Sequence, residues 1–193
     1  MEAFYTIQGE GTHSGRAAYF IRLGGCDVGC VWCDVKESWP VDSHPLMEIQ
    51  NIVSDALRQP ARLAVITGGE PLMHNLDELT SELQTVGFET NIETSGAYPL
   101  SGSWNWICLS PKKFKKPLPE IYKAANELKI IVFNKSDFKW AEEQAALVSE
   151  DCKLLLQPEW SQQDKMMPLI VEYVKTHPQW RVSLQTHKFM DIP

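Results

Sequence analysis

The sequence has no long apolar run and no excess of basic residues. A transmembrane helix needs about 18 or more consecutive apolar residues, so none is expected, and no amino-terminal signal peptide is evident. The formal net charge is −7, whereas a nucleic-acid-binding surface requires clustered Lys and Arg residues. We therefore expect a cytoplasmic protein that binds neither a membrane nor a nucleic acid.

The alternation of apolar segments predicts the fold class. Short apolar runs predict strands at 17–23, 63–66, 88–94, 104–109, 127–133, 153–156 and 180–184. Helical spacing predicts helices at 49–57, 76–86, 136–148 and 164–175, whereas residues 1–11 are expected to end in a glycine-spaced turn. This alternation predicts an α/β fold with a mostly parallel sheet, closed into a partial TIM-like barrel, in a single domain over residues 1–193.

Three of the five cysteines lie within eight residues, in Cys26-Asp27-Val28-Gly29-Cys30-Val31-Trp32-Cys33. In an intracellular chain this spacing favours a metal site over disulfides. The loop follows a predicted strand, so it would lie at the carboxyl end of the sheet, where barrel and open-sheet enzymes place their chemistry.

A zinc site is one interpretation of this loop. Structural zinc takes four ligands, and the fourth would have to come from Cys108, Cys152 or His44, none of which belongs to a second paired motif. The other interpretation is a four-iron cluster held by three thiolates, which leaves one iron free to bind a small molecule. The pattern C-x3-C-x2-C, with Trp32 before the last cysteine, resembles the radical S-adenosylmethionine superfamily.

Three further motifs follow predicted strands. Thr67-Gly68-Gly69-Glu70-Pro71 combines two glycines, which let a ligand approach the backbone, with a carboxylate suited to an ammonium group. Glu93-Thr94-Ser95-Gly96 adds hydroxyls, and Ser110-Pro111-Lys112 adds a cation. Each of these motifs is also compatible with an ordinary turn. Among the histidines only His187 ends a predicted strand, and we do not expect it to be catalytic.

The motifs taken together carry a more specific resemblance. Gln8-Gly9-Glu10-Gly11, the cysteine loop, Thr67–Pro71, Glu93–Gly96, Ser110–Lys112, Leu156-Gln157-Pro158 and Gln185-Thr186-His187-Lys188 resemble the 7-carboxy-7-deazaguanine synthase family nearly end to end. The resemblance implies a radical ring contraction of 6-carboxy-5,6,7,8-tetrahydropterin to 7-carboxy-7-deazaguanine, with loss of ammonia, on the route to queuosine. A 5'-deoxyadenosyl radical would remove hydrogen from carbon 6 of the pterin.

The same resemblance implies a set of site residues. Cys26, Cys30 and Cys33 would hold a [4Fe-4S] cluster. The pterin would contact Ile7, Gln8, Gly9, Arg22, Thr67 and the carboxylate of Pro193, and Arg22 suits its carboxylate because a guanidinium can bind both oxygens. S-adenosylmethionine would contact Trp32, Cys33, Asp34, Gly69, Glu70, Ser95, Ser110, Pro111, Lys112 and Gln157.

One position departs from the family. A Thr whose hydroxyl ligates Mg2+ commonly follows the Cys-Asp pair, but this chain has Val35 there, so magnesium would depend on oxygen atoms from substrate and solvent. By resemblance we also expect a homodimer and a flavodoxin-like electron donor. The alternatives are a radical activating enzyme that acts on a partner protein and a zinc-stabilised binding module without chemistry.

Overall fold

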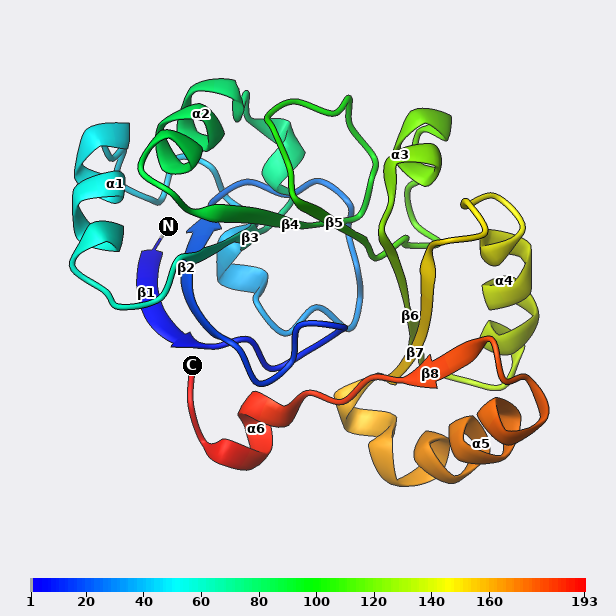
Figure 1. The fold of residues 1–193 in the computed structure, drawn as a ribbon. Helices are drawn as coiled ribbons and strands as arrows, with labels where there is room; N and C mark the ends of the chain where they lie inside the picture. Colours follow the sequence, from blue (N-terminus) through cyan, green and yellow to red (C-terminus); the bar gives the residue numbers. More distant parts are fainter. Residues whose placement is uncertain (1) are drawn as a thin grey trace.

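The structure, a computed structural model, describes residues 2–193, which form one curved sheet with helices around its outer side (Figure 1). Its eight strands lie side by side in sequence order: β1 (Glu2–Ile7), β2 (Ala17–Leu23), β3 (Leu63–Gly68), β4 (Glu89–Thr94), β5 (Trp106–Leu109), β6 (Glu127–Val132), β7 (Lys153–Pro158) and β8 (Trp180–Val182). Strand β1 pairs antiparallel with β2, and every later pair is parallel.

The helices lie in the crossover segments between parallel strands, except for the last helix, which follows the last strand. These are α1 (Ile49–Leu57), α2 (Asp77–Thr85), α3 (Pro119–Ala124), α4 (Ser136–Ala145), α5 (Gln163–Thr176) and α6 (Thr186–Met190), with short 3-10 turns η1 (Lys36–Ser38), η2 (Pro71–Met73) and η3 (Trp160–Gln162). Helices α1 to α5 lie outside the sheet because one stripe of each is apolar and must be buried. Ile52 and Val53 of α1 and Leu79 and Leu83 of α2, for example, are buried in the core.

The sheet does not close into a full barrel within residues 2–193, since β1 and β8 are not paired. Instead, the chain after β8 returns to the segment after β1, and both ends of the chain lie on the same side of the molecule (Figure 1). Thr186 donates a backbone hydrogen bond of 2.8 Å to Gly9 O, and Gly11 N donates to Ser183 Oγ at 3.0 Å. The gap in the barrel is therefore sealed by loops rather than by a strand pair.

The partial barrel and its mostly parallel sheet are confirmed, and so are all the predicted strands and helices, with small shifts in their ends. Strand β1, the short helices α3 and α6 and the three 3-10 turns were not predicted. No helix within residues 2–193 is long and apolar enough to cross a bilayer.

Candidate functional site

A cavity of about 280 Å³ opens at the carboxyl ends of the strands and brings most of the predicted site residues together. Its lining includes all of the predicted substrate-binding residues, namely Ile7, Gln8, Gly9, Arg22, Thr67 and Pro193. It also includes Cys26, Cys30, Trp32, Cys33, Asp34, Gly69, Ser95, Ser110, Lys112 and Gln157. The cysteine loop and the proposed pterin residues thus face one space.

Two of the predicted residues do not line this cavity. Pro111 is buried beside a second, smaller cavity, which lies on the outer side of the β5 and β6 strand ends. Glu70 is only 1% exposed, and its carboxylate accepts hydrogen bonds from Leu72 N, Thr94 Oγ1 and both Ser95 N and Ser95 Oγ, at 2.5–3.0 Å. Four donors occupy both of its oxygens, so the Glu70 carboxylate fixes Ser95 instead of facing a ligand.

Close backbone contacts explain why the same motif contains two glycines. Gly68 has φ +137°, and a Cβ atom there would lie 2.1 Å from Leu23 O. A Cβ atom at Gly69 would lie 2.3 Å from Gly25 O, just before the first cysteine. The turn after β3 can therefore pack directly against the start of the cysteine loop, to which Glu70 N donates a 2.8 Å bond at Gly25 O.

The cysteine loop fits a cluster held by three thiolates. Cys26, Cys30 and Cys33 are free thiols on the cavity lining, whereas Cys108 and Cys152 are buried elsewhere in the protein. Among residues 2–193 no three His, Cys, Asp or Glu side chains converge as ligands of one metal ion. Each thiolate of a four-iron cluster binds a different iron, and three free thiols of one loop on the cavity lining fit such a cluster.

Burial shapes the chemistry of these thiols. It raises the pKa of the Cys26 thiol, and it raises the pKa of Cys30 to about 11 although the nearby Lys112 opposes the shift. The polypeptide alone therefore keeps Cys26 and Cys30 protonated at neutral pH, and a metal held by these residues would supply the positive charge that stabilises the thiolates. The loop itself is anchored by Asp27, which accepts bonds from Tyr98 (2.6 Å) and Lys115 (2.8 Å).

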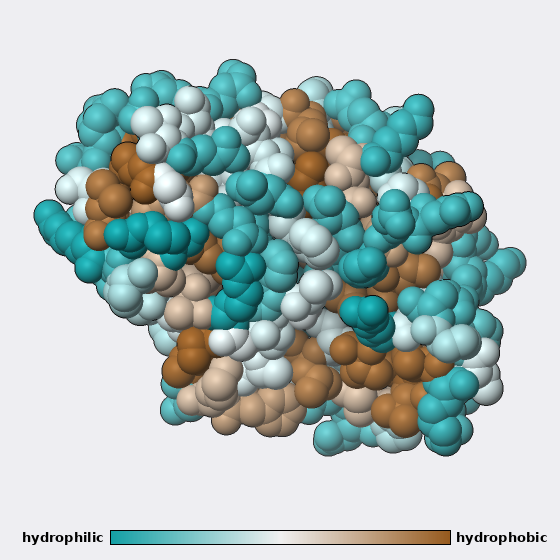
Figure 2. All heavy atoms as spheres, in the orientation of Figure 1, coloured by the Kyte–Doolittle hydropathy of each residue, from teal (hydrophilic) through white to brown (hydrophobic). Residues whose placement is uncertain are grey.

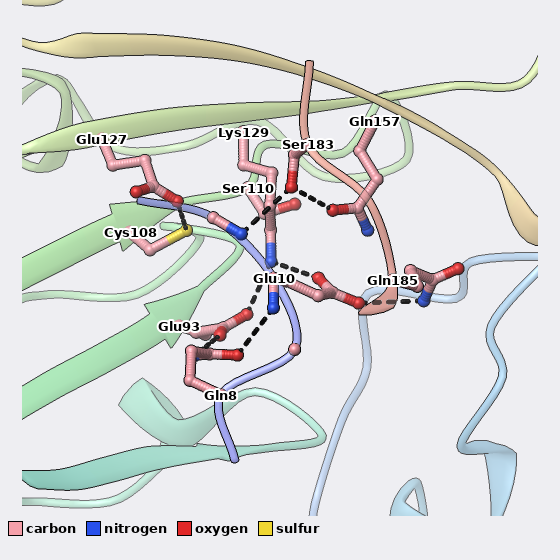
Figure 3. A network of polar contacts seen from close by, with 12 residues as sticks. Gln8, Glu10, Glu93, Cys108, Ser110, Glu127, Lys129, Gln157, Ser183 and Gln185 are labelled. Carbon is pink, nitrogen blue, oxygen red and sulfur yellow. Dashed lines mark hydrogen bonds and ion pairs between the residues drawn. The ribbon is translucent and has the colours of Figure 1, made fainter. Parts of the chain in front are cut away.

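The floor of the cavity is a network of charges that the sequence did not predict (Figure 3). Lys129, on β6, is 3% exposed and bridges Glu10 at 2.5 Å and Glu93 at 2.8 Å. Gln8 donates to the other oxygen of Glu93, and Gln185 donates to Glu10. Burial favours a neutral Glu10, but attraction to Lys129 and hydrogen bonds hold its pKa at about 2. One cation between two carboxylates leaves this floor with a net negative charge.

Strand β2 contributes a positive charge to the cavity, opposite in sign to the charge of the floor. Arg22 lines the cavity, lies 5.1 Å over the ring of Phe4 and forms an ion pair with Glu2, the residue directly opposite it on β1. The cavity therefore offers a guanidinium on its wall and carboxylates on its floor. A ligand that carries a carboxylate at one end and N–H donors at the other matches both features.

Beside the cysteine loop, Lys112 donates to Ser110 O at 2.7 Å and lies 5.6 Å over the ring of Trp32. Burial lowers the pKa of Lys112. His187 also lines the cavity, and a Cβ atom at Gly9 would lie 2.3 Å from its Nδ1. Burial lowers the pKa of His187, so its imidazole is neutral at pH 7.

The comparisons with known proteins agree with this geometry. A family profile described as "Radical SAM superfamily" matches residues 20–109. Over its full length the chain is 57% identical to the 7-carboxy-7-deazaguanine synthase of Flavobacterium psychrophilum and covers 91% of it. The chain belongs to the 7-carboxy-7-deazaguanine synthase family. The Escherichia coli synthase is 36% identical over 99% of this chain and 97% of its own length.

The fold of the family is also shown by a solved relative. The crystal structure of QueE from Escherichia coli superimposes with a TM-score of 0.82 at 35% identity, covering 96% of this chain and 92% of that one. Membership of a radical SAM family implies a [4Fe-4S] cluster and S-adenosylmethionine, which the three-thiol loop fits. The relatives support neither the activating enzyme nor the zinc module.

Proposed function

We propose that this chain converts 6-carboxy-5,6,7,8-tetrahydropterin to 7-carboxy-7-deazaguanine with loss of ammonia. Similarity over the whole chain to enzymes named for this product supports the proposal. The observation that carries it is the content of the cavity: three thiols, a guanidinium and an acidic floor share one space. Residues 1–193 would act as one radical SAM domain, supported by the single sheet.

In this proposal the substrate lies between Arg22 and the floor. Arg22 would exchange Glu2 for the substrate carboxylate, because a guanidinium binds both oxygens of a carboxylate. At the floor, the carboxylate of Glu93 and the amide of Gln8 would bind the N–H groups and carbonyl of the pyrimidinone ring. Ile7, Gly9, Thr67 and Pro193 would complete the pocket, since they line the same cavity.

The cluster would be held by Cys26, Cys30 and Cys33. When bound, the reduced cluster and S-adenosylmethionine supply an organic radical that removes a hydrogen atom from the substrate. Trp32, Cys33, Asp34, Gly69, Ser95, Ser110, Lys112 and Gln157 would contact S-adenosylmethionine. Glu70 would act as a positioning residue through Ser95, and Pro111 would shape the turn that carries Ser110 and Lys112.

The chain's own task is to align the substrate carbon and to exclude water. Trp32, Trp39, Phe4 and Phe20 supply apolar walls around the cavity. Lys112 is held by Ser110 in a fixed position, so it would present its ammonium to a carboxylate or ribose without a large rearrangement.

Four further assignments complete the proposal. Magnesium, where used, would be held by substrate and water oxygens, because Val35 lines the cavity without an oxygen ligand. A flavodoxin-like protein would reduce the cluster. The chain would act as a homodimer, for which the exposed Phe189 and Met190 of α6 offer an apolar surface; Figure 2 shows hydrophobic side chains along that lower edge. A reducing cytoplasm suits its free thiols.

The test is anaerobic turnover. Reconstituted protein with dithionite, S-adenosylmethionine and carboxypterin should yield 7-carboxy-7-deazaguanine by mass spectrometry. Arg22→Gln should lower kcat/KM by roughly tenfold to hundredfold, because hydrogen bonds to a charged group contribute about 1.5–3 kcal/mol. Its cluster spectrum should be unchanged. Cleavage of S-adenosylmethionine by the wild type without consumption of carboxypterin would show that the substrate assignment is wrong.

A further inference from the structure

A second cavity, of about 210 Å³, lies against the outer side of the cysteine loop. Three exposed apolar side chains surround it: Val31 (69% exposed), Phe114 (46%) and Phe133 (38%). They come from three separate segments, namely the cysteine loop, the turn after β5 and the end of β6. Exposed apolar groups gathered from several segments mark an interaction surface more often than scattered single residues do.

This apolar patch of Val31, Phe114 and Phe133 lies next to the main cavity. Trp32, Lys112 and Ile131 line both cavities and so form a common wall between them. Phe114 lies at the tip of the turn between Lys112 and Lys115, and its ring centroid is 6.3 Å from that of Trp32. Val31 stands between two of the cysteines, so the patch covers the place where the cysteine loop reaches the surface.

The charge around the patch is opposite to that of the chain. Residues 112–116 and 133–140, the two segments that border the patch, hold six of the 18 Lys and Arg residues but only one of the 25 Asp and Glu residues. Lys116 and Lys135 are exposed in these two segments, whereas the charge of the exposed Lys113 is balanced by Asp137. The nearby acids are already neutralised, since Asp137 is buried and paired with Lys113, and Asp27 is paired with Lys115. An acidic partner would therefore meet an uncompensated basic rim.

We propose that this patch is the docking surface for an acidic one-electron carrier protein. This inference rests on the proposed function, in which the cluster must be reduced from outside. The carrier would lose one electron, and the cluster would gain it across the loop that holds the cysteines. Small, basic-rimmed apolar contacts suit transient redox encounters, which bury less than about 1,200 Å², and charge steering raises their association rates.

The test reverses charges on the rim without touching the cavity. Lys116→Glu and Lys135→Glu are combined, because both side chains are exposed. A carboxylate at position 135, at the amino end of α4, also suits the helix dipole, so the fold should not suffer. The matched control is Lys153→Glu, since Lys153 is exposed at the start of β7, at the opposite end of the parallel sheet.

Two readouts use the reconstituted enzyme with a flavodoxin as the probe. Calorimetry should show roughly tenfold weaker flavodoxin binding by the double variant at low ionic strength, and a smaller difference at 0.5 M salt. Stopped-flow bleaching of the cluster by photoreduced flavodoxin should slow in parallel. The rate of product formation with dithionite, and all values for Lys153→Glu, should match the wild type.

Unchanged flavodoxin affinity and bleaching rate in the double variant would overturn the proposal. So would a change in sedimentation of the double variant alone, because the patch would then join two copies of this chain. Failure of the proposed function can be distinguished from failure of the docking proposal. If the proposed function is wrong, the wild type with dithionite yields no product, while the flavodoxin titration still measures docking.

Discussion

Removing the buried cation of the cavity floor is the sharpest perturbation that the structure offers. The side chain of Lys129 is 3% exposed, and its ammonium neutralises two carboxylates, Glu10 and Glu93, that are each about four-fifths buried. In Lys129→Met both carboxylates stay buried without the cation. Removing one partner of a buried ion pair costs about 3–5 kcal/mol, a large share of the 5–15 kcal/mol by which such domains are stable.

The assay is urea denaturation of the cluster-free protein, in which tryptophan fluorescence reports the unfolding transition. We expect Lys129→Met to lose about 3–5 kcal/mol, and Lys129→Met with Glu10→Gln to recover part of this, since one buried charge is then gone. Lys175→Met is the matched control, because the pair of Lys175 with Glu172 is exposed and contributes at most about 1 kcal/mol.

The pH dependence gives a second check on the same variant. Glu10 has a folded pKa of about 2, below its ordinary value of 4.5, so its contribution to stability is present above pH 4.5 and is lost as the pH falls toward 2. Without Lys129 the pKa of Glu10 should rise, so Glu10 should take up a proton at a higher pH. A neutral Glu10 is no longer an unpaired buried charge, so its protonation should stabilise the folded variant. The deficit of Lys129→Met should therefore shrink between pH 7.5 and pH 5. A deficit below 1 kcal/mol, or one independent of pH, refutes this reasoning.

Three further predictions concern the cavity. Glu2→Gln should lower the KM for carboxypterin several-fold without changing kcat, because Glu2 competes for Arg22; an unchanged KM in steady-state assays contradicts this. Val35→Thr should make turnover respond to added Mg2+, measured with and without a chelator, and no response would count against a metal position there. Glu70→Gln should weaken S-adenosylmethionine binding about tenfold in calorimetry by releasing Ser95, whereas wild-type affinity would contradict its positioning role.

The positions of most strands and helices were predictable, because buried strands and amphipathic helices each leave a local pattern. The elements that escaped prediction lack one. Strand β1 acquires its place only by pairing with β2, and α6 is five residues long, too short to show helical periodicity. The glycine motifs after the strands indicated the cavity correctly, because turns at the carboxyl edge of a parallel sheet converge wherever the crossovers lead.

The charged floor of the cavity was not predicted from the sequence, because the residues that form it are far apart along the chain. Lys129 is 119 residues from Glu10 and 36 residues from Glu93. One signal was present, since Lys129 interrupts the otherwise apolar run Leu128-Lys129-Ile130-Ile131-Val132. A lysine in a buried strand must find carboxylates, although the sequence does not say which ones. Glu70 shows the converse: its motif suggested a ligand contact, but neighbouring donors satisfy it first.

Two glycine positions explain how such distant residues come to share one cavity. At Gly69 the absence of a side chain lets the turn after β3 lie against the first cysteine, and at Gly9 it lets His187 lie against the segment after β1. The first approach positions the cysteine loop, and the second seals the gap between β1 and β8. A fully paired barrel would fill its centre with side chains; here loops close the gap instead, which leaves space for a ligand between the thiols and the charged floor.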